Sequence, residues 1–178
     1  MQIKGANGYT ADVNAENRLL VSSVSVPSDH HLNDSGRVFS MYFRVTPAGA
    51  DDYFFYFKNE GTKKINITDI RASSTVATAL FYDHVTGTPS YVTGTDAETT
   101  SRLVGNSFEM NATAKYDTNI TGLTSQGVLF FEKCANVDTR YKLSTTSNII
   151  VSQGQAIAFR REAATGELDI VVSAVVEE

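Results

Sequence analysis

The residues that could do acid–base or metal chemistry are few and scattered in this 178-residue chain. Two of its three histidines stand in the triplet Asp29-His30-His31, which resembles part of a metal site. Adjacent side chains of an extended segment point to opposite faces, however, so this pair cannot easily ligate one ion. We therefore predict a polar surface loop at the triplet rather than a metal centre.

Other reactive residues also lack the context that chemistry needs. Asp83-His84 could supply two members of a hydrolase triad, but no local motif marks a nucleophile. A calcium site at Asp51-Asp52 would need several more oxygen ligands, so we predict solvated loop carboxylates there. Cys134 is the single cysteine and ends an apolar run, which favours a small buried residue. We predict no catalytic, cofactor-binding or metal-binding residue, and a protein that is not an enzyme.

The charge of the chain is moderately acidic. Fifteen Lys and Arg against twenty Asp and Glu leave a net charge of −5, which argues against broad nucleic-acid binding and against a polybasic membrane anchor. The paired bases Lys63-Lys64 and Arg160-Arg161 are predicted to offset the acidic excess or to meet acidic patches on a partner. No basic segment followed by an apolar one opens the chain, so we expect neither a secretory signal nor glycosylation. The four N-x-S/T triplets begin at Asn33, Asn66, Asn111 and Asn119.

The elements that must position these side chains are β-strands. In residues 37–46, apolar and polar side chains alternate with period two, which predicts a half-buried strand, and residues 167–176 repeat the pattern. The alternation of Phe108, Met110 and Ala112 predicts another strand. Further strands are predicted at residues 19–26, 53–58, 64–71, 76–82, 128–134, 141–143, 148–151 and 155–161.

About eleven short strands with turn-rich connections predict an all-β fold, an antiparallel sandwich or barrel. A parallel sheet would need crossover helices, and the connections are too short for them. Residues 164–166 are predicted to join the last two strands as a hairpin. The one stretch with any helical pattern is a turn within residues 10–17.

Two segments raise the question of what covers them. Residues 53–57 are apolar on both faces, so the second face needs a cover. The chain itself is the preferred cover, and a neighbouring subunit is the alternative. Residues 1–17 are polar and are predicted to form an extended N-terminal arm, either held by a neighbour or disordered. Residues 18–178 are predicted to form a single β-sandwich domain.

Several segments resemble those of a known class of proteins. The opening GYTADV at residues 8–13, followed by NRLLVS at residues 17–22, resembles the start of small structural proteins from tailed bacteriophages. FYFKNEG at residues 55–61, with KINITDI at residues 64–70, resembles their strand–turn–strand pattern. IVSQGQAIAF at residues 150–159 resembles the end of the jelly rolls that serve as capsid decoration, or cement, proteins.

This resemblance implies an antiparallel, jelly-roll-like β-sandwich with an extended N-terminal arm. It also implies a virion protein on the capsid exterior, made in the host bacterial cytoplasm, that binds on or between capsomers. The implied partners are the major capsid protein or other virion proteins and further copies of the chain, with a trimer favoured. Neither nucleic acid nor membrane is an implied partner, and the family carries no catalytic residues to transfer.

Two other functions stay open. A tail or fibre module that binds host-surface glycans would share the fold, and an exposed tyrosine such as Tyr91 could stack on a sugar. An enzyme on a cupin-like barrel would need clustered histidine and carboxylate ligands. Three scattered histidines disfavour that enzyme.

Overall fold

The computed structural model describes residues 2–4, 10–12, 35–105, 107–134, 141–143, 149–162 and 166–177. The chain divides into two compact units, residues 1–31 and 32–178. In the first unit, β1 (Gln2–Lys4) pairs antiparallel with β2 (Thr10–Asp12). The helical turn predicted within residues 10–17 is therefore wrong at residues 10–12, where backbone pairing with β1 imposes an extended conformation. The predicted strand at residues 19–26 lies outside the described residues.

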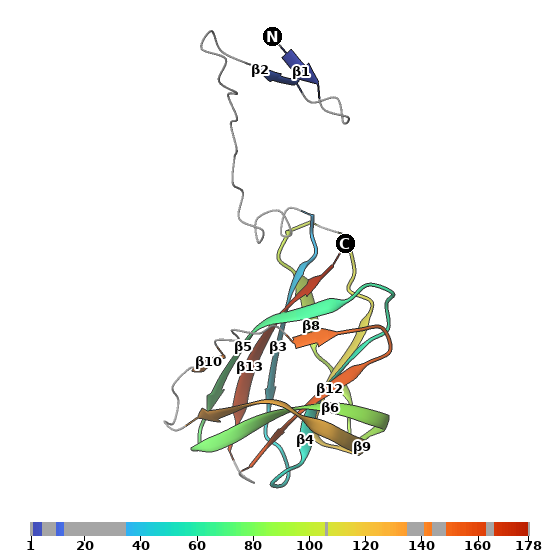
Figure 1. Cartoon of the computed structure of the whole chain (residues 1–178). Helices are drawn as coiled ribbons and strands as arrows, with labels where there is room; N and C mark the ends of the chain where they lie inside the picture. The colour runs from blue at the N-terminus through green and yellow to red at the C-terminus, as the bar shows by residue number, and fades with distance from the viewer. Residues whose placement is uncertain are drawn as a thin grey trace. The chain divides into compact units, whose positions relative to one another are not determined.

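The second unit is an antiparallel β-sandwich, and its described residues contain no helix (Figure 1). This confirms the predicted fold class. One sheet has the order β10 (Tyr141–Leu143), β5 (Ile65–Ser74), β13 (Leu168–Val176), β3 (Val38–Val45), β8 (Glu98–Ser101), with β11 (Ile149–Val151) also on β5. The other has the order β4 (Tyr53–Asn59), β12 (Ala156–Arg161), β6 (Thr78–Tyr91), β9 (Ala112–Cys134), β7 (Thr95–Asp96).

Most strands that follow one another in the chain lie in different sheets, as in a jelly-roll-like sandwich. The chain changes sheet between β3 and β4, between β4 and β5, and between β5 and β6. It changes again between β12 and β13, because β12 pairs with β4 and β6 whereas β13 pairs with β3 and β5. The hairpin predicted at residues 164–166 is therefore wrong. Its two strands have their apolar faces turned toward one core from opposite sides, so they cannot share a ladder.

The core lies between the sheets and is rich in aromatic side chains. Phe39, Met41 and Phe43 of β3 point inward and are at most 2% exposed, as the alternation predicted. Phe43 stacks on Phe55 of the opposite sheet, with ring centres 4.6 Å apart. A fully buried Phe or Met side chain stabilises a fold by about 1.5–3 kcal/mol. Because Phe43 and Phe55 belong to different sheets, their contact stabilises the packing of one sheet on the other.

The second face of β4 is covered by the chain itself, which was the preferred prediction. Tyr56 is 4% exposed and packs in a separate cluster with Val85, Ile120, Ala156 and Ala158. The cover arises because β9 pairs with β4 along its first part and with β6 from Ile120 onward. The paired strands β6 and β9 thereby cover the outer face of β4 and β12.

The strand predicted from the alternation at residues 108–112 is wrong before residue 112. The inward direction is right for Met110, which packs against the core, whereas Phe108 contacts Phe39, with ring centres 6.0 Å apart, but stays 41% exposed. Residues 107–111 nevertheless belong to no strand. The Asn111 carbonyl instead accepts hydrogen bonds from the N–H groups of residues 60 and 61 in the β4–β5 connection. The alternation of apolar and polar residues predicts which way the side chains face, but it does not predict whether another strand hydrogen-bonds to the backbone.

Candidate interaction surface

Three side chains on three adjacent strands form a row on the outer face of the second sheet. The register places Arg160 of β12 beside Phe81 of β6, and Phe81 beside Phe131 of β9. The guanidinium carbon of Arg160 lies 4.3 Å from the Phe81 ring centre, and the Phe81 and Phe131 rings stack with centres 6.2 Å apart. We call these three side chains the aromatic row. It ends in a ring that is open to solvent, because Phe131 is 61% exposed.

Two carboxylates fix the charged end of this row. Asp83 is fully buried, and its Oδ2 accepts hydrogen bonds from Arg160 Nε at 3.0 Å and from the Tyr53 hydroxyl at 2.8 Å. Asp51 Oδ1 accepts a further bond from Arg160 Nη1 at 2.5 Å. Burial lowers the pKa of Arg160, but the bonds and charges of both carboxylates outweigh it and raise that pKa above its ordinary value. The guanidinium is therefore held charged and in place beside Phe81.

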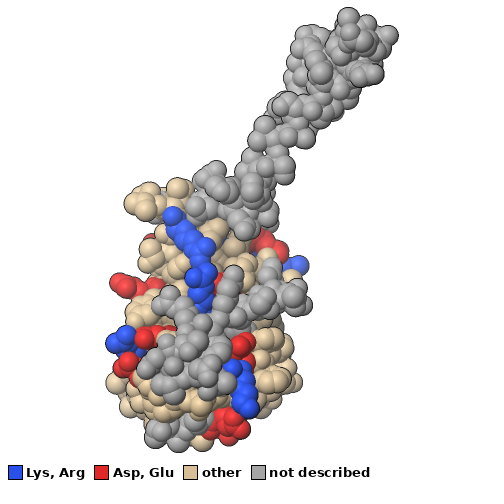
Figure 2. Space-filling model, turned by 90° about the vertical axis from the view of Figure 1, so that its left-hand side faces the viewer, with Lys and Arg blue, Asp and Glu red and all other residues tan. Residues whose placement is uncertain are grey.

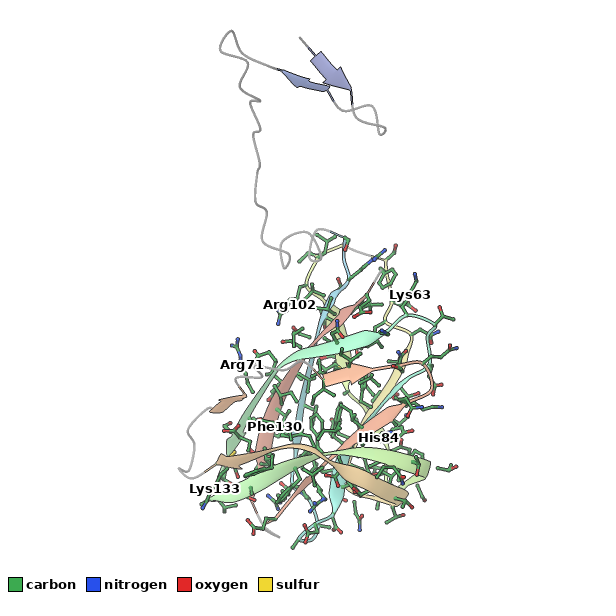
Figure 3. All side chains as sticks on the ribbon, viewed as in Figure 1. Lys63, Arg71, His84, Arg102, Phe130 and Lys133 are labelled. Carbon is green, nitrogen blue, oxygen red and sulfur yellow. The ribbon has the colours of Figure 1, made fainter. Side chains whose placement is uncertain are left out.

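The row ends at a strand that has a neighbour on one side only. Among the described strands, β6 is the sole partner of β9 from residue 121 to residue 134. Val128 is 48% exposed and Leu129 is 50% exposed on this strand. In Figure 3, Phe130 points toward the core whereas Lys133 stands at the surface near the end of β9. We call Val128, Leu129, Phe131 and Lys133 the β9 edge.

A strand edge of this kind can bind another chain. Its unpaired N–H and C=O groups can hydrogen-bond an added strand, and its exposed apolar side chains can pack against those of the added strand. Such an edge supplies no reactive group. The chemistry of the surface is therefore recognition through backbone pairing and apolar contact.

A second feature is a groove of about 740 Å³ between β8 and the start of β9. Phe39 and Phe108 line it, together with the hydroxyl side chains of Thr99 and Thr100 and the carboxylate of Glu109. Phe108 is 41% exposed there. The groove thus combines an accessible aromatic ring with hydrogen-bonding groups.

Among the described residues, the side chains considered above for catalysis or metal binding are not brought together. Asp83 bonds to Arg160 and Tyr53, whereas Nε2 of the neighbouring His84 lies 3.0 Å from Gln155 Oε1. Asp51 is exposed, as a loop carboxylate should be, but it is also ion-paired to Arg160. The triplet at residues 29–31 lies outside the described residues.

The prediction that the paired bases offset acidic charge is right for Arg160 and wrong for Arg161. Arg160 neutralises carboxylates of its own chain, and Arg161 is fully buried. Arg161 donates to the carbonyls of Gly166 at 2.6 Å and Pro47 at 3.3 Å. A signal was present in the sequence, because adjacent residues of a strand face opposite ways and one base had to point inward. Lys63 and Lys64 are exposed, as expected of a connection between strands.

Cys134 is a small buried residue, as predicted, and burial raises the pKa of its thiol to about 11. Tyr91, by contrast, is not the exposed platform that sugar stacking would need. Its hydroxyl is buried, its ring packs on the cluster around Tyr56, and the Lys115 ammonium lies 5.9 Å from the ring centre. Of the four N-x-S/T asparagines, Asn66 is half-buried with its amide bonded to Glu177, Asn111 is exposed, Asn119 is half-buried, and Asn33 is outside the described residues.

Charged side chains of both signs are interspersed on the face that Figure 2 presents. Within the described ranges, no three His, Cys, Asp or Glu side chains gather closely enough to hold a metal ion. The same residues include no helix of the length and apolarity that crossing a membrane requires. Comparisons with protein-family models, curated proteins and solved structures find no match to this chain.

Proposed function

We propose that this chain is a structural virion protein of a tailed bacteriophage that decorates the capsid exterior and stabilises the shell. The observation that carries the proposal is the order of the strands. One sheet contains β3, β13, β5 and β10 and the other contains β4, β12, β6 and β9, and this antiparallel β-sandwich is consistent with the jelly-roll-like fold that the resemblance implies. A fold alone does not specify a function, so the resemblance of residues 8–22, 55–70 and 150–159 supplies the class of protein.

The physical properties of the sandwich suit such a role. A protein that clamps a shell works by burying surface at many equivalent positions, which requires a body that keeps its shape. Here one aromatic core joins both sheets, and hydrogen bonds tie Arg160 to carboxylates and Arg161 to backbone carbonyls. The apolar β9 edge offers contact area to another protein.

The proposed partners are the major capsid protein, or another virion protein, and further copies of this chain. The test is assembly with shells of the phage that encodes it. The purified protein should bind expanded shells at a fixed number of copies per capsomer, measured by quantitative gel analysis and by imaging of the decorated particles. Absence of the chain from purified virions, or binding without a fixed ratio, would contradict the proposal.

The predicted N-terminal arm, residues 1–17, can be tested in the same assay. Its deletion should lower shell occupancy because the arm would lose its contacts with a neighbour. A matched control replaces the arm with a Gly/Ser segment of equal length. This control distinguishes the effect of the arm's sequence from the effect of its length. Unchanged occupancy in both variants would show that the arm has no part in attachment.

The groove between β8 and β9 favours one alternative, a tail or fibre module that binds host-surface glycans. Its exposed Phe108 ring beside hydroxyl and carboxylate groups is a suitable surface for a sugar. Glycan-array binding that Phe108→Ala abolishes and Phe131→Ala leaves unchanged would support this function. The absence of any array signal would remove it.

A further inference from the structure

We propose that two copies of this chain pair along the β9 edge. The strands run antiparallel, and Phe131 of one copy lies opposite Phe131 of the other. This inference rests on the backbone direction, the side chains and the charges of residues 129–133. It does not depend on the virion proposal.

The backbone direction follows from one hydrogen bond on the far side of β6. The N–H of Glu162 donates to the carbonyl of Ala79 at 2.9 Å, so the backbone polar groups of Ala79 point toward β12. Backbone groups of successive strand residues point to opposite sides. Those of Leu80 therefore point toward β9.

Leu80 pairs with Glu132, so the N–H and C=O of Glu132 point back toward β6. The N–H and C=O groups of the neighbouring residues Phe131 and Lys133 then point away from β6. On that side of β9, no described strand pairs with residues 121–134. Two antiparallel copies of Phe131 can thus exchange a reciprocal pair of N–H···O=C bonds across a two-fold axis.

The side chains extend the row that the fold already contains. Pairing at Phe131 places the open rings of two aromatic rows next to each other. The joined row runs from Arg160 through Phe81 and Phe131 to the second copy's equivalents and ends in a guanidinium on both sides. Each Phe131 ring, 61% exposed in the single chain, gains an aromatic neighbour on its open side.

Charge selects this register. Residues 128–134 carry one acid and one base, so the strand is neutral and does not repel its copy. With Phe131 on the axis, Glu132 lies opposite Phe130 and Lys133 lies opposite Leu129 of the second copy. A shift that put Glu132 on the axis would set two carboxylates directly against each other, which is destabilising. On the other side, the β-bulge at Leu129 ends the regular ladder.

The contact is short, so the dimer should be weak. A few strand residues bury less than the roughly 1,200 Å² of the smallest stable interfaces. We therefore expect a dissociation constant on the order of micromolar or weaker and a monomer–dimer equilibrium in concentrated solution. Sedimentation of the full chain over a range of concentrations measures it.

Two substitutions at the axis test both the pairing and the register. Phe131→Lys and Phe131→Glu each place like charges against each other, so each variant alone should dimerise at least tenfold more weakly. An equimolar mixture of the two should dimerise again, because opposite charges then meet at the axis. Val104→Lys is the matched control, since Val104 is 97% exposed and is not part of the β9 edge, and it should dimerise like the unchanged chain.

Circular dichroism and thermal unfolding establish that each variant is folded. The inference is overturned if the unchanged chain stays monomeric at the highest concentration, if it forms a trimer, or if Phe131→Lys dimerises as well as the control. A mixture that stays monomeric would overturn the assigned register. None of these results bears on capsid binding, which the shell assay measures separately.

Discussion

Asp117 is a buried carboxylate whose role is to hold a turn. Its oxygens accept the N–H groups of Thr93 and Gly94, both at 2.8 Å, and of Thr118 at 2.6 Å. Burial by itself raises the pKa of this group, but the backbone hydrogen bonds outweigh it and bring the pKa below the ordinary 3.8. The charged form therefore stabilises the connection that follows β6.

The folded-state pKa of Asp117 lies below the unfolded one, so its stabilisation is complete above pH 4 or so and is lost as the pH falls through the folded pKa. Asp117→Asn removes a charged acceptor and should cost about 1–3 kcal/mol at neutral pH. The variant should also lose less stability on acidification than the unchanged chain. Urea unfolding at several pH values measures both effects. Asp96→Asn is the control, because Asp96 is largely exposed and its ion pair contributes little.

Arg161 is a fully buried cation whose hydrogen bonds go to backbone carbonyls. Burial lowers the pKa of its guanidinium. Arg161→Ala would leave the carbonyls of Gly166 and Pro47 without their donor and open a cavity at the end of the sandwich. We expect a loss of about 2–5 kcal/mol in the free energy of unfolding. Equal losses in Arg161→Ala and in the surface variant Lys63→Ala would contradict this role.

At the scale of the element, the pairing of β6 with β9 depends on two glycines whose backbones approach closely. A Cβ atom on Gly87 would stand 2.3 Å from the carbonyl oxygen of Gly122, and one on Gly122 would stand 2.4 Å from that of Thr88. Both glycines have positive φ, 106° and 76°. The close approach lets β6 and β9 bend over the cluster around Tyr56.

Gly87→Ala should therefore destabilise the fold by about 2–4 kcal/mol, since backbone strain and overpacking act together. Gly154→Ala is a matched control, because Gly154 also has positive φ, 73°, but no atom lies within 4 Å of its added Cβ. Chemical denaturation of the two variants compares them. A similar loss of stability in both variants would mean that the strain of a positive φ alone, and not the close contact with Gly122, makes alanine unfavourable at position 87.

At the scale of the whole molecule, the division into residues 1–31 and 32–178 predicts that the sandwich is independent of the N-terminal arm. Deletion of residues 1–17 should change the unfolding free energy of the sandwich by less than about 0.5 kcal/mol, because the described core clusters draw on residues 39–176. Urea unfolding followed by circular dichroism measures the change. A large loss would show that the arm contributes to the stability of the sandwich itself.

Much of the architecture could be predicted because it depends on local alternation. The period-two pattern in residues 37–46 and 167–176 identifies both the strand and its buried face, and the inward facing of Met110 was visible in the same way. The burial of Cys134 followed from its place at the end of an apolar run. These properties are set by neighbouring residues, so the amino-acid order alone determines them.

Which strands pair was decided only in three dimensions. The placing of β12 and β13 in different sheets and the lack of a strand partner for residues 107–111 both depend on residues distant in sequence. The row of Arg160, Phe81 and Phe131 likewise joins three strands through their register. A strand's own sequence sets which way its side chains face, but hydrogen bonds to other strands set its neighbours, and only the folded chain brings those strands together.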